Sequence, residues 1–274
     1  MPSDYDAILE SANYIRAGIR AQPKIAMILG TGLGGLAEKI DVDSAIPYGD
    51  IPHFRLPTVQ DHQGRLLIGR LSQQPVVAMQ GRLHYYEGYS LYEVTFPVRV
   101  LRELGAEVLI ISSAAGGLNP IYKPGDVMLV EDHINLTNQN PLRGLSDQRL
   151  GDRFPDMSQP YDKKLLELAE SAALERKIRL HRGVYVCVSG PSLETRAETR
   201  MLKLLGANCV GMSTVPEVIT GVQAGFRILV LAAITNVNIP DCMEVISLGQ
   251  VIANARVAEK KIETIIEEVV SRLD

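Results

Sequence analysis

Glycines and small hydroxyl residues, joined by one arginine and a few polar side chains, follow the apolar runs of this sequence. Thr31 lies in one such segment, Gly30-Thr31-Gly32, and Arg82 and His84 lie in the next, Gly81-Arg82-Leu83-His84. Glycine lets backbone N–H groups approach an oxyanion, hydroxyl groups add donors, and an arginine adds a bidentate positive charge. The same kinds of residue recur in Ser113-Ala114-Ala115-Gly116-Gly117, Gly190-Pro191-Ser192-Leu193-Glu194, Met212-Ser213-Thr214 and Thr235-Asn236. One glycine after a strand indicates only a turn, but all these segments together predict a phosphate pocket.

Other kinds of site fit the sequence less well. Residues 30–35 satisfy the dinucleotide pattern G-x-G-x-x-G, but little more than one helical turn follows, and no second strand ends in an acidic residue about 20 residues later. A serine hydrolase is disfavoured because G-x-S-x-G is absent and the segment GMSTV lacks the final glycine. The five histidines have no metal-ligand spacing and no Cys pair beside them. We therefore expect an anion-binding loop, no metal and no cofactor.

Apolar runs and amphipathic segments alternate along the chain. Buried strands are expected at 24–30, 108–117, 128–136, 182–190, 209–212 and 227–236, with an antiparallel pair at 65–71 and 75–81. Helices are expected at 4–20, 91–105, 162–177, 195–206, 214–225 and 247–272. This alternation indicates an α/β protein, one domain over residues 1–274, with a central mixed β-sheet flanked by helices. In an open sheet of this class, ligands collect at the carboxyl ends of the strands.

The composition limits the class of protein. With 274 residues, 46% hydrophobic and 22% charged, the chain can bury a large core and is not mainly disordered. A net charge of −4 provides no global positive field for nucleic acid or anionic lipid. The three cysteines are far apart and odd in number, which suits a reducing compartment. The first residues lack a signal-peptide pattern and no apolar run approaches ~20 residues, so we expect a soluble cytoplasmic protein without a membrane partner.

Some chemically capable residues are expected to be structural. His133 lies inside the apolar run MLVEDHINL and is expected to be a hydrogen-bonded structural residue. His181 is expected to lie in a charged loop and to be solvated. Cys187 and Cys209 lie in apolar strands and are expected in the core. The segment 137–160 is long, polar and interrupted by prolines, which is typical of a functional or interface loop.

The strand-end segments, in this order, closely resemble those of the trimeric purine nucleoside phosphorylases. The most specific matches are GRLHYYEGYS (81–90) and GMSTVPEV (211–218), and others are ILGTGLGGL (28–36), SSAAGGLNP (112–120) and SGPSLETRAETRMLKLLGA (189–207). The resemblance covers nearly the whole chain from about residue 22. It implies the nucleoside phosphorylase type of fold. It also implies cleavage of a purine nucleoside by phosphate, through a transition state like an oxocarbenium ion, to the free base and ribose 1-phosphate.

The resemblance also assigns roles to individual positions. It implies phosphate contacts at Thr31, His62, Arg82, His84, the backbone of Ala114, and Ser213. It implies nucleoside contacts at Tyr86, Phe154, Tyr185, Leu193, Glu194, Met212 and Asn236. Asn236 would stabilise a proton at purine N7 and Glu194 would accept from N1–H, a pairing that suits 6-oxopurines such as those of inosine and guanosine. His84 completes the implied catalytic set, and Phe154 would enter a neighbouring subunit's ribose pocket in a homotrimer.

Two positions depart from the pattern of the family. Thr31 replaces a serine found in many relatives and keeps the hydroxyl group. Leu248, aligned through Glu244 and Val251, replaces a histidine that contacts the nucleoside 5′-OH in many relatives. An apolar residue there would favour a 5′-deoxy or 5′-thioether group, so a 5′-methylthio nucleoside phosphorylase is the alternative, which Asn236 opposes because that subfamily reads a 6-amino base with aspartates. Leu248 could equally belong to the apolar face of the closing helix.

A third hypothesis belongs to another class of protein: a nucleotide-binding or interaction module without catalysis. It does not account for the joint presence of Arg82, His84, Glu194 and Asn236.

Overall fold

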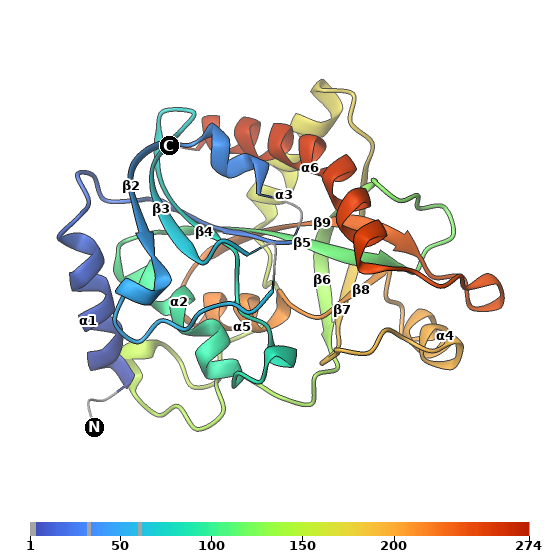
Figure 1. The fold of residues 1–274 in the computed structure, drawn as a ribbon, viewed down its shortest axis with the longest axis horizontal. Coiled ribbons are helices and arrows are strands. Elements are labelled where there is room, and N and C mark those ends of the chain that lie inside the picture. The colour runs from blue at the N-terminus through green and yellow to red at the C-terminus, as the bar shows by residue number, and fades with distance from the viewer. Residues whose placement is uncertain (1–3, 32–33, 60–61, 274) are drawn as a thin grey trace.

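Nine strands form one mixed β-sheet within residues 4–31, 34–59 and 62–273, the parts of the chain that the computed structural model describes (Figure 1). In spatial order the strands are β2-β3-β4-β1-β5-β8-β7-β6-β9. Their bounds are β1 Ile25–Leu29, β2 Asp41–Pro47, β3 Arg65–Leu71, β4 Gln74–Gln80, β5 Val108–Gly117, β6 Val127–Asn135, β7 Leu180–Cys187, β8 Cys209–Gly211 and β9 Arg227–Val237. The predicted α/β class with a central mixed sheet is confirmed.

Strand β2 is the one strand of the described chain that the sequence does not predict. The antiparallel pair β3–β4 is present as expected, with Arg65 opposite Gln80. β2 pairs antiparallel with β3 at the edge of the sheet, and its side chains are exposed or half-buried. Because an edge strand that contacts little of the core needs no apolar run, its hydropathy pattern carries no signal.

Strand β5 belongs to two parts of the sheet at once. Residues 108–111 pair in parallel with β1, and Gly116 and Gly117 pair antiparallel with β8. Along its whole length β5 also pairs in parallel with β9, which in turn pairs antiparallel with β6. Strands β5, β8, β7, β6 and β9 therefore close into a ring. From the sequence we expect an open sheet, but this part of the sheet is closed. The β6–β9 pairing that closes it joins segments far apart in the chain, so the local sequence pattern does not reveal it.

The helices lie on both faces of the sheet (Figure 1). α3 and α6 pack together on one side, α2 and α5 lie on the other, and α1 packs against α2. Their bounds, each inside a predicted helical segment, are α1 Asp4–Arg16, α2 Leu91–Glu103, α3 Lys163–Glu175, α4 Arg196–Leu204, α5 Val215–Gln223 and α6 Leu248–Ser271. No helix in the described ranges has the length and hydropathy that crossing a membrane requires.

The core extends from the strands into helix α5. Every residue of β1 is buried, and Cys187 and Cys209 are buried free thiols, as predicted. Most residues of α5 are buried as well, including Glu217 with only 2% of its surface exposed. A buried carboxylate is costly unless it finds donors or a positive partner. Glu217 therefore requires a partner inside the protein.

The two histidines expected to be structural or solvated behave differently. His133 Nδ1 lies 3.0 Å from the Tyr161 hydroxyl oxygen, which confirms a hydrogen-bonded structural residue. The expectation for His181 is wrong: it lies in β7, is buried, and its Nε2 lies 2.9 Å from Asp126 Oδ2. Asp126 is 55 residues away in the chain, so local sequence could not reveal the contact.

Helix α4 begins with a capping box that local sequence specifies, and its removal should lower stability. Thr195 Oγ1 accepts from the Glu198 N–H (3.2 Å), and Glu198 Oε2 accepts from the Thr195 N–H (2.8 Å). Thr195→Ala should cost about 1 kcal/mol, which lowers Tm by roughly 2–4 °C in a chain of this size. Thr195→Ser, which keeps the hydroxyl, should melt close to the wild type in the same thermal scan. Equal Tm values for all three proteins would contradict this assignment.

Candidate active site

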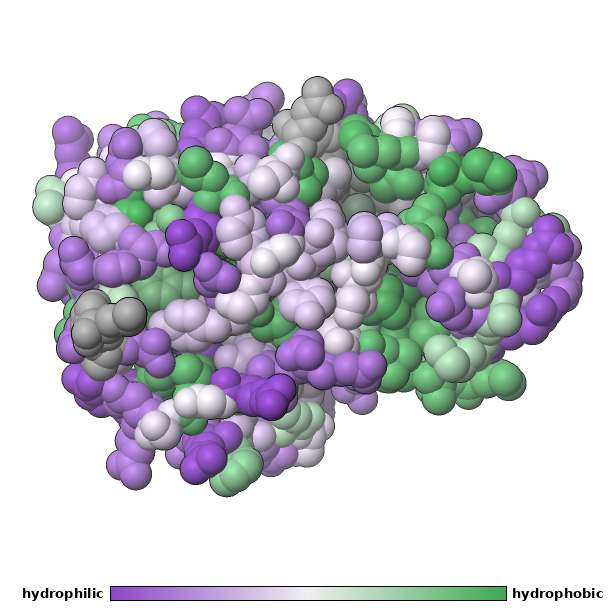
Figure 2. Space-filling view, turned by 60° about the horizontal axis from the view of Figure 1, so that its bottom comes forward, coloured by the Kyte–Doolittle hydropathy of each residue, from purple (hydrophilic) through white to green (hydrophobic). Residues whose placement is uncertain are grey.

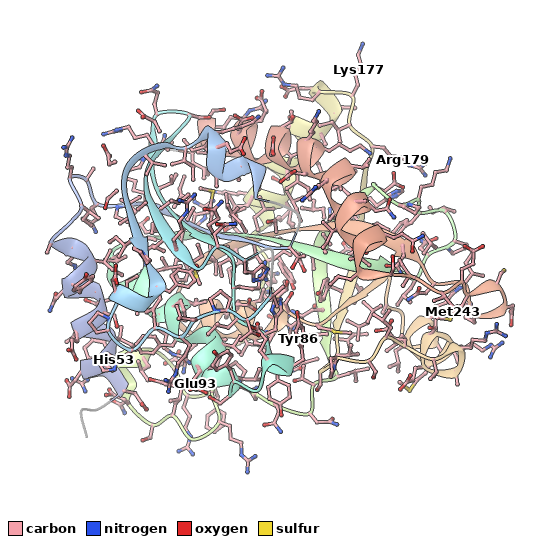
Figure 3. All side chains as sticks on the ribbon, in the orientation of Figure 1. His53, Tyr86, Glu93, Lys177, Arg179 and Met243 are labelled. Carbon is pink, nitrogen blue, oxygen red and sulfur yellow. The ribbon has the colours of Figure 1, made fainter. Side chains whose placement is uncertain are left out.

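A cavity at the carboxyl ends of β1, β4, β8 and β9, and along the last residues of β5, collects most of the residues predicted to bind ligand. The predicted residues that line it are Thr31, Arg82, His84, Tyr86, Ala114, Leu193, Glu194, Met212, Ser213, Asn236 and Leu248. Figure 3 shows Tyr86, one of this group, near the middle of the molecule. The structure thus brings together residues from distant segments at the strand ends, and their individual roles stay predictions.

Arg82 is a buried cation held by three protein groups. Its Nη1 donates to Glu217 Oε1 (3.2 Å) and Thr214 Oγ1 (3.3 Å), and its Nη2 donates to the Ser112 carbonyl oxygen. Gly30 makes room for this arrangement, because a Cβ there would lie 2.6 Å from the Ser112 oxygen and 3.1 Å from Arg82 Nη2. The result is a guanidinium held in a fixed place on the cavity wall, paired with Glu217 and suited to donate hydrogen bonds to an anion.

His62 lies behind the cavity wall and bridges two of the predicted phosphate ligands. Its Nδ1 is 2.7 Å from the Arg82 carbonyl oxygen, and its Nε2 is 3.0 Å from Thr31 Oγ1. Burial, followed by the nearby His84 side chain, lowers the pKa of His62 to about 4. The ring is therefore neutral near pH 7 and positions the Thr31 hydroxyl.

His84 has one ring nitrogen committed to a carboxylate. Its Nδ1 lies 2.9 Å from Glu87 Oε1, and its ring stacks on Tyr86 at a centroid distance of 4.7 Å. Burial would raise the pKa of Glu87, but hydrogen bonds from His84 and Thr58 outweigh it and lower the pKa to about 2. An ionised Glu87 holds Nδ1–H, which leaves Nε2 of His84 as the nitrogen that can contact a ligand.

Tyr185 does not line the cavity, although the resemblance implies that it would. It is completely buried beneath the cavity floor, and its hydroxyl lies 3.4 Å from Ser113 Oγ. Ser113 Oγ is in turn 3.2 Å from Ser213 Oγ, so Tyr185 supports a predicted phosphate ligand through one intermediate. Gly211 leaves the space for the tyrosine, because a Cβ at that position would collide with the Tyr185 hydroxyl. Burial raises the pKa of Tyr185, which keeps the phenol protonated.

A second hydrogen-bonded group contains both predicted purine ligands and one residue that the sequence reasoning missed. Asn238 Nδ2 donates to Glu194 Oε2 (3.3 Å), and Asn238 Oδ1 accepts from Asn236 Nδ2 (2.7 Å). The Thr235 hydroxyl donates to Asn236 Oδ1 at 2.9 Å. Burial raises the pKa of Glu194. Asn238 comes directly after β9, two residues beyond Asn236, so its place in the same strand-end segment was the available signal.

The cavity also has an apolar wall formed by the first turns of α6. Leu248 and Val251, three residues apart on one helix face, both line it. Hydrophobic residues gather toward the right-hand end of Figure 2, the end where α4 and the start of α6 lie in Figure 1. The exposed apolar side chains on or beside those elements are Leu193, Met201, Leu204, Leu205, Val245 and Leu248. Leu248 thus faces both the cavity and solvent, and does not lie in the core.

Phe154 does not line the cavity within this chain. Phe154 is 86% exposed and lines a separate hollow with His133 and Met157. Gly32, a member of the predicted anion-binding loop, lies outside the described residues. Farther along, the Gly35 N–H donates to Glu259 Oε1 of α6 at 2.6 Å. In the described ranges, no three His, Cys, Asp or Glu side chains group closely enough to hold a metal ion.

Comparisons with known proteins agree on one family. The sequence model described as "Phosphorylase superfamily" matches residues 24–271. Purine nucleoside phosphorylase 1 of Geobacillus stearothermophilus is 50% identical over 84% of each chain. Isoform 2 of purine nucleoside phosphorylase from Schistosoma mansoni, solved with cytosine and ribose 1-phosphate, superposes with a TM-score of 0.94 at 39% identity, covering 98% of this chain and 97% of that one. Schistosoma purine nucleoside phosphorylase with hypoxanthine gives 0.92 at 37% identity, covering 98% of each chain.

The low pKa of His62 predicts a specific loss of stability in acid. An unfolded histidine titrates near 6.5, whereas His62 titrates at about 4 in the folded protein. Between these values the unfolded state binds the extra proton, so stability is complete above pH 6.5 and falls as the pH drops toward 4. The fall in Tm from pH 7 to pH 4.5 should therefore be smaller in His62→Asn than in the wild type. His53→Asn, at a partly exposed histidine, is the control, and identical slopes for His62→Asn and wild type would contradict the prediction.

Proposed function

The chain belongs to the phosphorylase superfamily and, within it, to the purine nucleoside phosphorylases, and we propose that it cleaves 6-oxopurine nucleosides with inorganic phosphate. Inosine and guanosine, or their deoxy forms, are the proposed substrates, and the products are the free base and (deoxy)ribose 1-phosphate. One observation carries the proposal: a buried arginine and the Glu194–Asn238–Asn236 group line the same cavity. An anion site beside a carboxylate–amide pair suits phosphate and a purine held together.

The proposed role of the first group is to hold phosphate as a nucleophile. Thr31, Arg82, His84 and Ser213 line the cavity and carry hydroxyl, guanidinium and imidazole groups that suit a phosphate ion. A phosphate oxygen forms the new bond to C1′ while the C1′–N9 bond breaks, and the electron pair of that bond leaves with the purine. Positioning and electrostatics supply the catalysis, so the proposal includes no metal and no cofactor, and phosphate is a co-substrate.

The proposed role of the second group is to accept the purine as it becomes negative. Asn236 Oδ1 is suited to accept from a proton at N7, and Glu194 is suited to accept from N1–H of a 6-oxopurine. Asn238 supports both, because it donates to Glu194 and accepts from Asn236. A 6-aminopurine has no N1–H for the carboxylate, so this group favours inosine and guanosine over adenosine.

Activity with and without phosphate tests the proposal directly. The purified protein should release hypoxanthine from inosine only when phosphate is present, and adenosine should be a poorer substrate. Arg82→Ala should lower kcat/KM for phosphate roughly ten- to a hundredfold, because a charge-assisted contact is lost. Equal release of base in phosphate-free buffer would indicate a hydrolase, and unchanged phosphate kinetics in the variant would remove Arg82 from the anion site.

A second substrate class, 5′-methylthio or 5′-deoxy nucleosides, is favoured by the apolar cavity wall. Leu248 and Val251 both line the cavity and neither can pair with a 5′-OH. Burying an unpaired hydroxyl costs about 1–3 kcal/mol by mutational measures. Asn236, in contrast, does not suit the 6-amino base of methylthioadenosine. The combination supports a 6-oxopurine nucleoside with an apolar 5′ substituent as an accepted substrate.

Two nucleosides that differ only at the 5′ carbon test this wall. If Leu248 contacts that carbon, 5′-deoxyinosine should match or exceed inosine in kcat/KM, and Leu248→His should reverse the order by adding a donor. If Leu248 is only part of an apolar helix face, inosine is preferred by the wild type. In that case Leu248→His changes Tm without changing the ratio of the two substrates.

Assembly and location complete the proposed function. The resemblance to the trimeric enzymes suggests a homotrimer in which Phe154 completes a neighbouring subunit's ribose pocket, and the exposure of Phe154 leaves its ring free for that contact. Cys187, Cys209 and Cys242 are all free, which supports a reducing location such as the cytoplasm. The proposed ligands are a purine nucleoside and phosphate, without nucleic acid or membrane partners.

A further inference from the structure

Helix α5 begins with the same sequence signature as three other helices but uses it differently. The pattern of Ser or Thr followed three residues later by Glu or Gln forms a reciprocal capping box. Such boxes are formed by Ser90 and Glu93 of α2, Thr195 and Glu198 of α4, and Ser247 and Gln250 of α6. Thr214 and Glu217 of α5 match the pattern, yet no side chain caps this helix.

Both members of the α5 pair turn to the buried arginine instead. Glu217 Oε1 lies 3.2 Å and Thr214 Oγ1 lies 3.3 Å from the same nitrogen, Arg82 Nη1. The side chains of Arg82 and Glu217 are 3% and 2% exposed, so water does not compete for these bonds. Thr214 has φ +74°, a left-handed conformation that is costly for a β-branched residue. Helix α5 thus lacks an ordinary side-chain cap, and its backbone is strained at Thr214, the residue that contacts Arg82.

The hydrogen bonds leave little freedom to the guanidinium. Nη2 is bonded to the Ser112 carbonyl oxygen, and Nη1 is bonded to α5. Arg82 Nε and Glu217 Oε2 have no partner among the described residues. The orientation of the Arg82 guanidinium therefore depends on three hydrogen bonds, and two of their acceptors are Glu217 Oε1 and Thr214 Oγ1. An arginine without these acceptors could rotate about its side-chain bonds and would lose its fixed place on the cavity wall.

We propose that Thr214 and Glu217 form a diverted helix cap that positions Arg82 for phosphate, with Glu217 Oε1 as the principal acceptor. This inference rests on the proposed function for the identity of the anion. Glu217 is a positioning residue, since it acts through Arg82, and its effect should be specific for phosphate. The carboxylate also neutralises the charge of Arg82, so an experiment must separate the hydrogen bond from the charge.

Two substitutions at one position make that separation. Glu217→Ala and Glu217→Gln remove the same negative charge, but only Gln retains an oxygen that can accept from Nη1. In steady-state assays with phosphate varied at saturating inosine, Glu217→Ala should raise KM for phosphate roughly tenfold or more. In Glu217→Gln, KM for phosphate should be at most about twofold higher than in the wild type, because the pocket keeps the acceptor oxygen and gains net positive charge. KM for inosine, measured at saturating phosphate, should change less than about twofold in both variants.

The matched control is Glu93→Ala, which breaks the ordinary capping box of α2 (Figure 3). It should lower Tm while leaving both KM values unchanged. Equal phosphate KM values for the Ala and Gln variants, or equal changes in the phosphate and inosine KM values, would overturn the positioning role.

A binding measurement tests the positioning role without relying on catalysis, and a second pair of variants replaces Glu217→Ala if that protein does not fold. Inorganic phosphate should raise the Tm of the wild type and of Glu217→Gln, and should raise the Tm of Glu217→Ala much less at the same concentration. If Glu217→Ala does not fold, Thr214→Ala with Thr214→Ser as its hydroxyl-retaining partner replaces it in both assays. A wild type that binds phosphate without cleaving inosine would contradict the proposed reaction alone, whereas equal phosphate protection of all variants would contradict the positioning role.

Discussion

Strand β5 is shared between the parallel half of the sheet and the closed ring, and this sharing determines where a ligand can bind. Its first residues lie between β1 and β9, and its last residues reach β8. The strand therefore passes from the core to the cavity. Its Ser112 contacts the arginine, its Ser113 contacts Ser213, and its Gly116 lies beside the side-chain amide of Asn236. Both β8 and β9 pair directly with β5, and the β6–β9 pairing closes the ring on the far side, so the strand ends around the cavity belong to one continuous hydrogen-bonded structure.

The polar groups of the cavity form two small hydrogen-bonded networks. Most buried polar atoms in proteins are hydrogen-bonded, because leaving one unpaired in a low-dielectric interior costs about 1–3 kcal/mol. One network includes Arg82, Glu217, Thr214 and the serines, and the other includes Glu194, Asn238 and Asn236. Each network fixes its members before a ligand arrives, so binding needs little further ordering.

Local chemistry and packing conflict at the start of α5, and the conflict is informative. Sequence rules favour a capping box at Thr214 and Glu217, and the structure shows strain and an uncapped helix instead. Departures of this kind concentrate at functional sites. Here the departure coincides with the buried cation, which ties the strain to the electrostatics of the cavity.

The sequence by itself determined the elements and most members of the site. Hydrophobic periodicity located the helices and all described strands except β2, and the residues after each strand anticipated most of the cavity lining. Such features depend on local spacing, which the chain carries in every conformation. Only the tertiary structure decided the closure of the ring, the burial of Tyr185 and His181, the diversion of Glu217 to Arg82 and the bridge made by Asn238. Each of these depends on contacts between residues far apart in the chain, and the geometry of such contacts exists only after the segments have packed.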